Sequence, residues 1–264
     1  MKLHCAVVFV CLFVLPEVGF AGIILTSSVP SYSQNFDTLA NSGATGTALP
    51  SGWLISESGG AANSSYGVGT GSLTTGNTYS FGLAGDTDRA LGGLQTGTLI
   101  PLFGVSFQNG GTTSILDFTI TYVGEQWRVG AVSRLDRLDF QFSKDATSLT
   151  TGTWSDLNSL DFARSGGVAV GAVNGNLAAN RQSLTSVLTD ANLAVGDSLW
   201  IRWQDFDATG FDDGLAIDDF QVTANFAPAA VPEPATGVLL GAISLLAWRL
   251  RRRTSVANKA SASS

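Results

Sequence analysis

Residues 116–123, which read LDFTITYV, alternate apolar and polar side chains over eight positions. Such alternation places the two sets of side chains on opposite faces of an extended strand, so it predicts a β-strand with one buried and one solvated face. Similar runs recur between turns rich in Gly, Ser and Asn, and residues 184–193 are the best candidate for a helix. The expected strands are 32–39, 53–57, 78–83, 89–94, 102–108, 116–129, 137–143, 154–162, 198–206 and 215–224. Ten strands predict an all-β fold with two sheets.

The N-terminus has the three parts of a secretory signal peptide. Lys2 supplies a positive charge, residues 6–15 are apolar, and residues 19–21 are suited to cleavage by signal peptidase. We therefore expect residues 1–21 to be removed on export and the mature chain to begin near Gly22.

The expected cleavage also removes both cysteines and the single histidine, which are Cys5, Cys11 and His4. A mature domain without these residue types excludes cysteine nucleophiles, Ser-His-Asp triads, zinc sites with His or Cys ligands, and disulfides. Any remaining chemistry depends on carboxylates, hydroxyls, amides and a few basic side chains.

The C-terminal region has a three-part pattern of its own. Pro232, Glu233 and Pro234 precede an uncharged apolar segment, residues 235–248. A helix over that segment rises about 21 Å, which is short of a hydrocarbon core of about 30 Å, but long basic side chains can reach the headgroups. We expect a single transmembrane helix after a linker at 227–231, with a cytoplasmic tail at 254–264; the alternative is a buried core helix. The basic cluster that sets this orientation consists of Arg249, Arg251, Arg252 and Arg253.

The order of Pro-Glu-Pro, apolar segment and arginine cluster over residues 232–253 resembles the PEP-CTERM sorting signal of exopolysaccharide-producing Gram-negative bacteria. The resemblance implies that a membrane-embedded exosortase recognises Pro232, Glu233 and Pro234 and cleaves near them. It also implies an inner-membrane anchor before processing, and then delivery to the cell envelope or the extracellular matrix. An ordinary single-span anchor is the alternative.

The charge of residues 22–226, the expected exported domain, limits its partners. This segment contains 19 of the 21 acidic residues, all except Glu17 and Glu233, but only 8 of the 14 basic ones. Neutralisation of phosphates requires basic patches, so nucleic acid is excluded as an expected partner.

Short motifs within the exported domain resemble the jelly roll of concanavalin-like proteins and carbohydrate-binding modules. They are residues 36–37 (FD), 88–92 (DRALG), 124–128 (GEQWR) and the closing 212–220 (DDGLAIDDF). The resemblance implies a jelly-roll-like β-sandwich in which the last strand pairs beside the first, so that residues 36–37 lie next to Asp218 and Asp219. Extracellular polysaccharide is the partner it implies.

Six aspartates lie within residues 205–219 with no Lys or Arg among them. Carboxylates at this density raise one another's pKa or attract a cation, and the spacing of Asp205, Asp207 and Gly210 resembles the start of a calcium loop. The twelfth position is Ala216 instead of Glu, so an EF-hand is excluded. The candidate calcium ligands are Asp37, Asp205, Asp207, Asp213 and Asp218; the alternative is that they are solvated turn residues.

Glu57 and Glu125 are the only glutamates of the exported domain. A glycosidase needs two carboxylates across a sugar, but we expect Glu125 to pair with Arg128 or Arg137, and therefore expect no enzyme activity. Trp127 and Trp200 are candidate rings for sugar contact.

These observations favour a noncatalytic polysaccharide-binding protein of the envelope or matrix. A glycan-active enzyme that uses carboxylates and a purely structural surface or adhesion protein are the alternatives.

Overall fold

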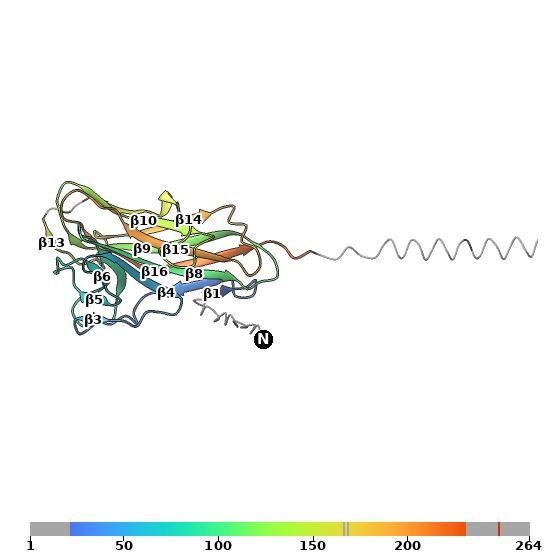
Figure 1. Cartoon of the computed structure of the whole chain (residues 1–264), viewed down its shortest axis with the longest axis horizontal. Helices are drawn as coiled ribbons and strands as arrows, with labels where there is room; N and C mark the ends of the chain where they lie inside the picture. The colour runs from blue at the N-terminus through green and yellow to red at the C-terminus, as the bar shows by residue number, and fades with distance from the viewer. Residues whose placement is uncertain (1–21, 166, 168, 231–247, 249–264) are drawn as a thin grey trace, which may run out of the picture. The chain divides into compact units, whose positions relative to one another are not determined.

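The computed structural model describes residues 22–165, 167, 169–230 and Trp248. The chain divides into two compact units, Met1–Ala227 and Pro228–Ser264, and every strand belongs to the first. The sheets face one another as two layers (Figure 1). The expected signal peptide, sorting motif and most of the transmembrane helix lie outside the described residues.

Seven strands form one sheet, and nine strands form the other. The seven-stranded sheet contains β1 (Ile23–Leu25), β4 (Trp53–Gly59), β8 (Leu99–Asn109), β10 (Leu135–Ser143), β11 (Ser155–Asp156), β12 (Phe162–Ser165) and β15 (Ser198–Asp205). The nine-stranded sheet contains β2 (Ser31–Gln34), β3 (Thr45–Gly46), β5 (Tyr66–Gly69), β6 (Asn77–Phe81), β7 (Ala90–Leu94), β9 (Ile115–Val129), β13 (Gly171–Ala172), β14 (Arg181–Leu188) and β16 (Gly214–Phe226). A single turn of 3-10 helix, η1 (Asn158–Leu160), lies between β11 and β12. The expected all-β sandwich is confirmed.

The core between the sheets follows from the alternation in the sequence. Phe118, Ile120 and Tyr122 of β9 are fully buried. They meet Trp203 of β15, whose ring stacks on Phe103 and Trp53 at centroid distances of 5.9 Å and makes edge contacts with Tyr122, Phe140 and Phe220. Aromatic rings of this size supply much of the apolar area that holds two sheets together without disulfides.

The expected pairing of the last strand with the strand predicted at residues 32–39 is confirmed for its first part, which forms β2. β2 pairs with β16 in antiparallel register, with Gln34 opposite Phe220 and Ser31 opposite Thr223. β16 pairs with β9 along its other side. β16, the last strand of the sandwich, is therefore central in its sheet.

The expected helix at residues 184–193 is wrong. Residues 181–188 form β14, which pairs with eight residues of β9 from Arg181 opposite Glu125 to Leu188 opposite Phe118. Leu184, Val187 and Leu188 have helical spacing, but β14 completes a ladder along the long strand β9, and this non-local pairing decides the conformation. Thr185 and Val187 are β-branched and suited to a strand.

Candidate functional site

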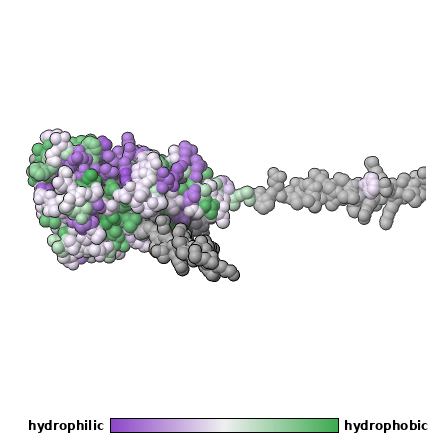
Figure 2. Space-filling model, in the orientation of Figure 1, coloured by the Kyte–Doolittle hydropathy of each residue, from purple (hydrophilic) through white to green (hydrophobic). Residues whose placement is uncertain are grey.

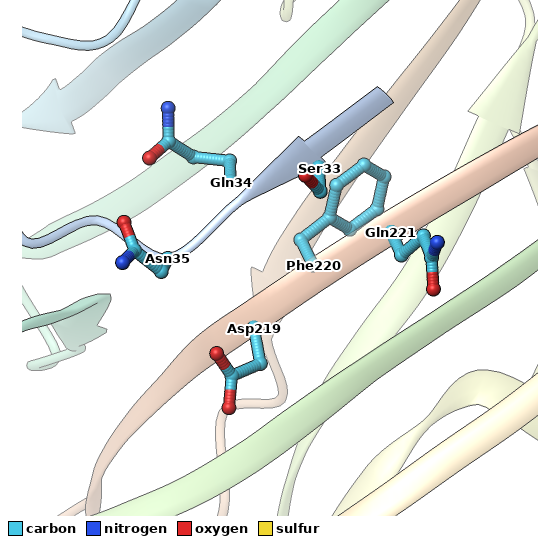
Figure 3. A pocket seen from close by; sticks show the side chains of 6 residues that line it. All are labelled: Ser33, Gln34, Asn35, Asp219, Phe220 and Gln221. Carbon is cyan, nitrogen blue, oxygen red and sulfur yellow. The ribbon is translucent and has the colours of Figure 1, made fainter. Parts of the chain in front are cut away.

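An open polar hollow lies beside β16, on the outer face of the nine-stranded sheet. It has a volume of about 440 Å³. Figure 3 shows the Phe220 ring pointing away from the Asp219 and Gln221 side chains, while Asn35 lies on the neighbouring segment. The residues that line it are Ser33, Gln34, Asn35, Asp219, Phe220 and Gln221.

A second hollow of about 390 Å³ also includes Asp219. Its other lining residues come from β9, from β14 and from the loop before β14, and they are Val123, Ala178, Arg181, Gln182 and Ser183. We call the two hollows together the Asp219 groove. Its side chains are mostly hydroxyls, amides, a carboxylate and a guanidinium.

A β-bulge in β16 places Asp219 in the groove. Asp218 lies opposite Val123 and Gln221 lies opposite Thr121, so two residues of β16, Asp219 and Phe220, face only Tyr122 of β9. Asp219 has a left-handed backbone (φ 47°), a conformation that Asp and Asn adopt more readily than most residues. The bulge leaves Asp218 and Asp219 on the outer face and returns Phe220 to the core.

The bulge coincides with a change of partner strand. β7 pairs with β16 only at Leu215–Ile217, and β2 pairs with it only from Phe220 onward. Neither β7 nor β2 pairs with Asp218 or Asp219 along this edge of β16. The groove therefore lies at a gap in the strand pairing of the sheet.

Two buried carboxyl groups lie next to residues of the groove. Glu125 is opposite Arg181 in the pairing of β9 with β14, and Asp218 directly precedes Asp219. Glu125 is 1% exposed and accepts a hydrogen bond from Trp127 Nε1 at 2.9 Å; burial raises its pKa to about 7. Asp218 is 6% exposed, and burial, followed by the charges of Asp219 and Glu125, raises its pKa to about 8. Its Oδ1 has no hydrogen-bond partner among the described residues.

The expected pairing of Glu125 with Arg128 or Arg137 is wrong. Arg128 donates to the carbonyl oxygen of Gly71 at 3.1 Å, and Arg137 pairs with Asp139. The alternation of β9 places Glu125 on the outer face beside Trp127, where Trp127 is buried against Phe81. Burial therefore raises the pKa of Glu125, whereas an arginine partner would have lowered it.

A second group of carboxylates lies at the end of the sandwich where β16 begins. Asp136, Asp205, Asp212 and Asp213 are each at most 4% exposed, and burial raises the pKa of each. Arg134 contacts three of them: its guanidinium lies 3.1 Å from Asp136, 3.8 Å from Asp212 and 3.6 Å from Asp213. We call these five residues the end cluster.

The five candidate calcium ligands do not meet at one site in the structure. Asp205 and Asp213 belong to the end cluster, and Asp218 lies at the bulge. Asp37 accepts hydrogen bonds from Asn35 and from the Arg89 backbone, and Asp207 is exposed in the loop after β15. Within the described ranges, no three Asp, Glu, His or Cys side chains are arranged to hold a metal ion. The five residues are spread over β15, the loop after it, β16 and the segment after β2, so their spacing in the sequence does not correspond to a single loop.

Calcium binding itself stays a prediction, which thermal melting of the purified protein tests. An ion present at a hundredfold excess over its Kd stabilises the folded state by about 2.7 kcal/mol, so added calcium would raise the melting temperature and a chelator would lower it again. An unchanged melting temperature in both conditions contradicts the prediction.

Trp127 and Trp200, the candidate rings for sugar contact, are both buried. Trp127 is 0% exposed, because it packs against Tyr79, Phe81 and Ala216 on the outer face of its sheet. Trp203 faces the core from β15, and Trp200 lies on the opposite, outer face of the same strand. On that face Leu102, Ala146 and Leu149 bury Trp200. Neighbouring side chains thus cover both rings, so neither ring is accessible for stacking on a sugar.

Sequence reasoning missed Ser33, Asn35, Arg181 and Gln221 as groove residues. One signal was available: in 215–220 (LAIDDF), two consecutive polar residues interrupt the alternation between Ile217 and Phe220. Such an interruption, with core residues on both sides of it, indicates a bulge.

The comparisons with known proteins concern the two parts of the chain separately. The PEP-CTERM protein-sorting motif matches residues 230–253, which confirms the resemblance seen in the sequence. This motif indicates a secreted protein that is anchored in the membrane before processing, and it implies processing by an exosortase.

Pro232 to Pro234 and the four arginines lie outside the residues that the structure describes. Among the described residues, no helix has the length and apolar character needed to cross a membrane.

Several solved structures are similar to the sandwich at low sequence identity. The CBM22-1 xylan-binding domain of Paenibacillus barcinonensis Xyn10C is 14% identical, with a TM-score of 0.36 over 75% of this chain and 95% of that one. The K3 cleaved adhesin domain of Lys-gingipain from Porphyromonas gingivalis is 11% identical, with a TM-score of 0.43 over 73% and 98%. The xylan-binding module CBM15 is 13% identical, with a TM-score of 0.33 over 67% and 93%. No curated protein matches the sequence.

Proposed function

We propose that the secreted β-sandwich is a noncatalytic polysaccharide-binding domain and that the Asp219 groove holds the polysaccharide. The observation that carries the proposal is that two open polar hollows, of about 440 and 390 Å³, share Asp219 as a lining residue. An open groove on a sheet face suits an internal segment of a long chain, whereas small ligands are usually enclosed more completely.

The side chains of the groove match the hydroxyl groups of a sugar. Each hydroxyl can donate one hydrogen bond and accept two. Asp219 supplies acceptors, Arg181 supplies donors, and the carboxamide of Gln221 supplies both. Among the described residues that line the two hollows of the groove, Phe220 is the only aromatic one, and it is 0% exposed. Recognition in the groove therefore depends on hydrogen bonds instead of ring stacking.

The charge of the domain selects the kind of polysaccharide. The 19 acidic residues of the exported segment exceed its 8 basic residues, and a surface of one sign repels ligands of the same sign. The preferred polysaccharide is therefore neutral. The sorting signal would deliver this protein to the envelope or the extracellular matrix of a Gram-negative bacterium, where it could meet extracellular polysaccharide.

Replacing Asp219 by asparagine is expected to weaken binding of matrix polysaccharide about tenfold, since a hydrogen bond to a charged group contributes about 1.5–3 kcal/mol. Asparagine tolerates the left-handed backbone, so the bulge is retained. The measurement is retention of the full-length protein on immobilised neutral matrix polysaccharide. Asp197→Asn, an equal charge change on an exposed turn, is the control and should bind like the wild type. Equal binding by both variants contradicts the role of the groove.

The same experiment separates the alternatives. A structural or adhesion protein without a sugar site would show no retention in any variant. A glycan-active enzyme would release reducing ends, and Glu125→Gln would abolish this release. Glu125 is 1% exposed, and a general acid must reach the glycosidic oxygen, so we expect no release.

A further inference from the structure

A third hollow lies at the end of the sandwich where β16 begins, and it is separate from the Asp219 groove. Its volume is about 220 Å³. About seven residues of strand separate Asp212 from Asp219, which corresponds to roughly 20 Å at about 3.3 Å per residue. We call this hollow the loop pocket, and the residues that matter here are Thr74, Gln95, Thr96, Arg128, Phe211 and Asp212.

Gln95, one of the residues that line the loop pocket, has a buried side-chain oxygen without a hydrogen-bond partner among the described residues. The residue is 4% exposed, and the atom without a partner is Oε1. Its backbone N–H is fixed by Asp205 Oδ2 at 3.2 Å, which holds the residue in place at the end of β7. A buried acceptor without a donor costs stability, so the pocket favours a ligand that brings a donor to this oxygen.

The rim of the loop pocket contains an exposed aromatic ring. Phe211 is 80% exposed, the largest exposed fraction among the large hydrophobic side chains that the structure describes. Arg134 donates a hydrogen bond to its carbonyl oxygen, and this fixes the backbone that carries the ring. Hydrophobic residues are visible at this end of the sandwich, near β13 (Figure 2). An exposed ring beside polar groups suits a ligand with one apolar face and many hydroxyls.

The polar groups of the pocket also limit the ligand's charge. Asp212 carries a carboxyl group and Arg128 a guanidinium, so a cation and an anion would each meet one group of its own sign. Thr74 and Thr96 add hydroxyls that can donate or accept. Because acceptors and donors are both present, an uncharged polyhydroxyl ligand fits better than an ion.

We infer that the loop pocket binds one neutral sugar residue or a similar small polyol, with Phe211 against its C–H face and Gln95 Oε1 accepting from a hydroxyl. This site does not depend on the Asp219 groove. It would recognise a free sugar or the end of a chain, because its volume of about 220 Å³ is below the range of about 300–1,000 Å³ that is typical for pockets of drug-sized ligands.

Saturation-transfer NMR with the full chain, in a detergent without a sugar headgroup, tests this inference. The probes are glucose, galactose, mannose, xylose, rhamnose, N-acetylglucosamine, sorbitol and glucuronate. We expect at least one of the neutral probes to bind and glucuronate to bind more weakly.

Two variants locate the binding. Gln95→Leu should weaken it by roughly three- to tenfold through loss of one hydrogen bond. The same change removes an unpartnered buried acceptor, so the melting temperature should be unchanged or higher. Phe211→Ala alters an exposed side chain and should also weaken binding. Phe206→Ala is its control, because Phe206 is on the same loop and 42% exposed but does not line the pocket.

Three results would overturn the inference. They are a lack of binding by every neutral probe, stronger binding of glucuronate than of the neutral probes, and wild-type binding by both Gln95→Leu and Phe211→Ala. If Asp219→Asn alone abolishes binding of the small sugars, the ligand lies in the groove; the proposed function then stands and the loop pocket does not.

Discussion

Replacing Arg134 by methionine is expected to lower the free energy of unfolding by about 3–5 kcal/mol near pH 8, the usual cost of removing one partner from a buried ionic group. Arg134 is the basic side chain that lies within 4 Å of the end-cluster carboxylates among the described residues, and it contacts Asp136, Asp212 and Asp213. Methionine fills a similar volume but carries no charge. The buried carboxylates would then repel one another without compensation.

The loss should depend on pH in a defined direction. Burial raises the pKa of all four aspartates, that of Asp212 to about 7. At about pH 5 these groups hold protons more readily in the folded state, so the arginine matters less and the loss should shrink. Urea unfolding at both pH values is the measurement.

Arg137→Met is the matched control for Arg134→Met. Arg137 pairs with Asp139 where the two side chains are 35% and 23% exposed, and partly exposed pairs contribute about 0–1 kcal/mol. Equal losses for the two variants, or a loss for Arg134→Met that does not change with pH, would contradict the account of the end cluster.

Replacing Asp218 by asparagine is expected to stabilise the domain by about 1–3 kcal/mol near pH 9, since it removes an incompletely satisfied buried carboxylate. The Asp219 backbone N–H donates to the Asp218 carboxyl group, and asparagine retains an acceptor for it.

The sign of the pH dependence follows from the raised pKa. The folded-state pKa of Asp218 is about 8, against an ordinary value of 3.8. Between about pH 4 and pH 8 the Asp218 carboxyl group is protonated in the folded state and ionised in the unfolded state. Unfolding therefore releases a proton, so the free energy of unfolding of the wild type falls as the pH rises through this range. Asparagine does not titrate, so the variant and the wild type should differ little at about pH 4 and most above pH 8. Thermal melting across this range is the test, with Asp197→Asn as the exposed control. If the variant is instead less stable than the wild type at about pH 9, the ionised Asp218 carboxylate stabilises the folded state and this explanation is wrong.

The alternation of apolar and polar residues was enough to predict the sandwich. Residues 116–129 correspond to β9, and 215–224 lie within β16, because each strand has one face in the core. Local patterns failed for β14, where Leu184 and Leu188 have helical spacing. Its conformation is set by pairing with β9, a contact between segments about 60 residues apart that no window of sequence contains.

The candidate site was less predictable than the fold, for two physical reasons. The exposure of Trp127 and Trp200 depends on loops that fold over the outer faces of the sheets, and alternation alone does not indicate such covering. The aspartates at 205–219 are close in sequence, but Asp213 lies just before β16 and Asp218 lies within it, so the extended strand separates them into different environments. Residues of the groove, such as Asn35 and Arg181, come from segments far apart in the sequence that approach one another only in the folded sandwich.

Hydrogen–deuterium exchange of the full-length protein, with and without neutral matrix polysaccharide, tests whether the Asp219 groove binds polysaccharide. We expect polysaccharide to slow exchange in three segments that border the Asp219 groove: residues 33–35, 181–183 and 219–221. We also expect Asp219→Asn to need about tenfold more polysaccharide for the same protection, and we expect no release of reducing ends during the experiment. Unchanged exchange in all three segments of the wild-type protein at saturating polysaccharide, or protection confined to other parts of the sandwich, would contradict binding in the groove.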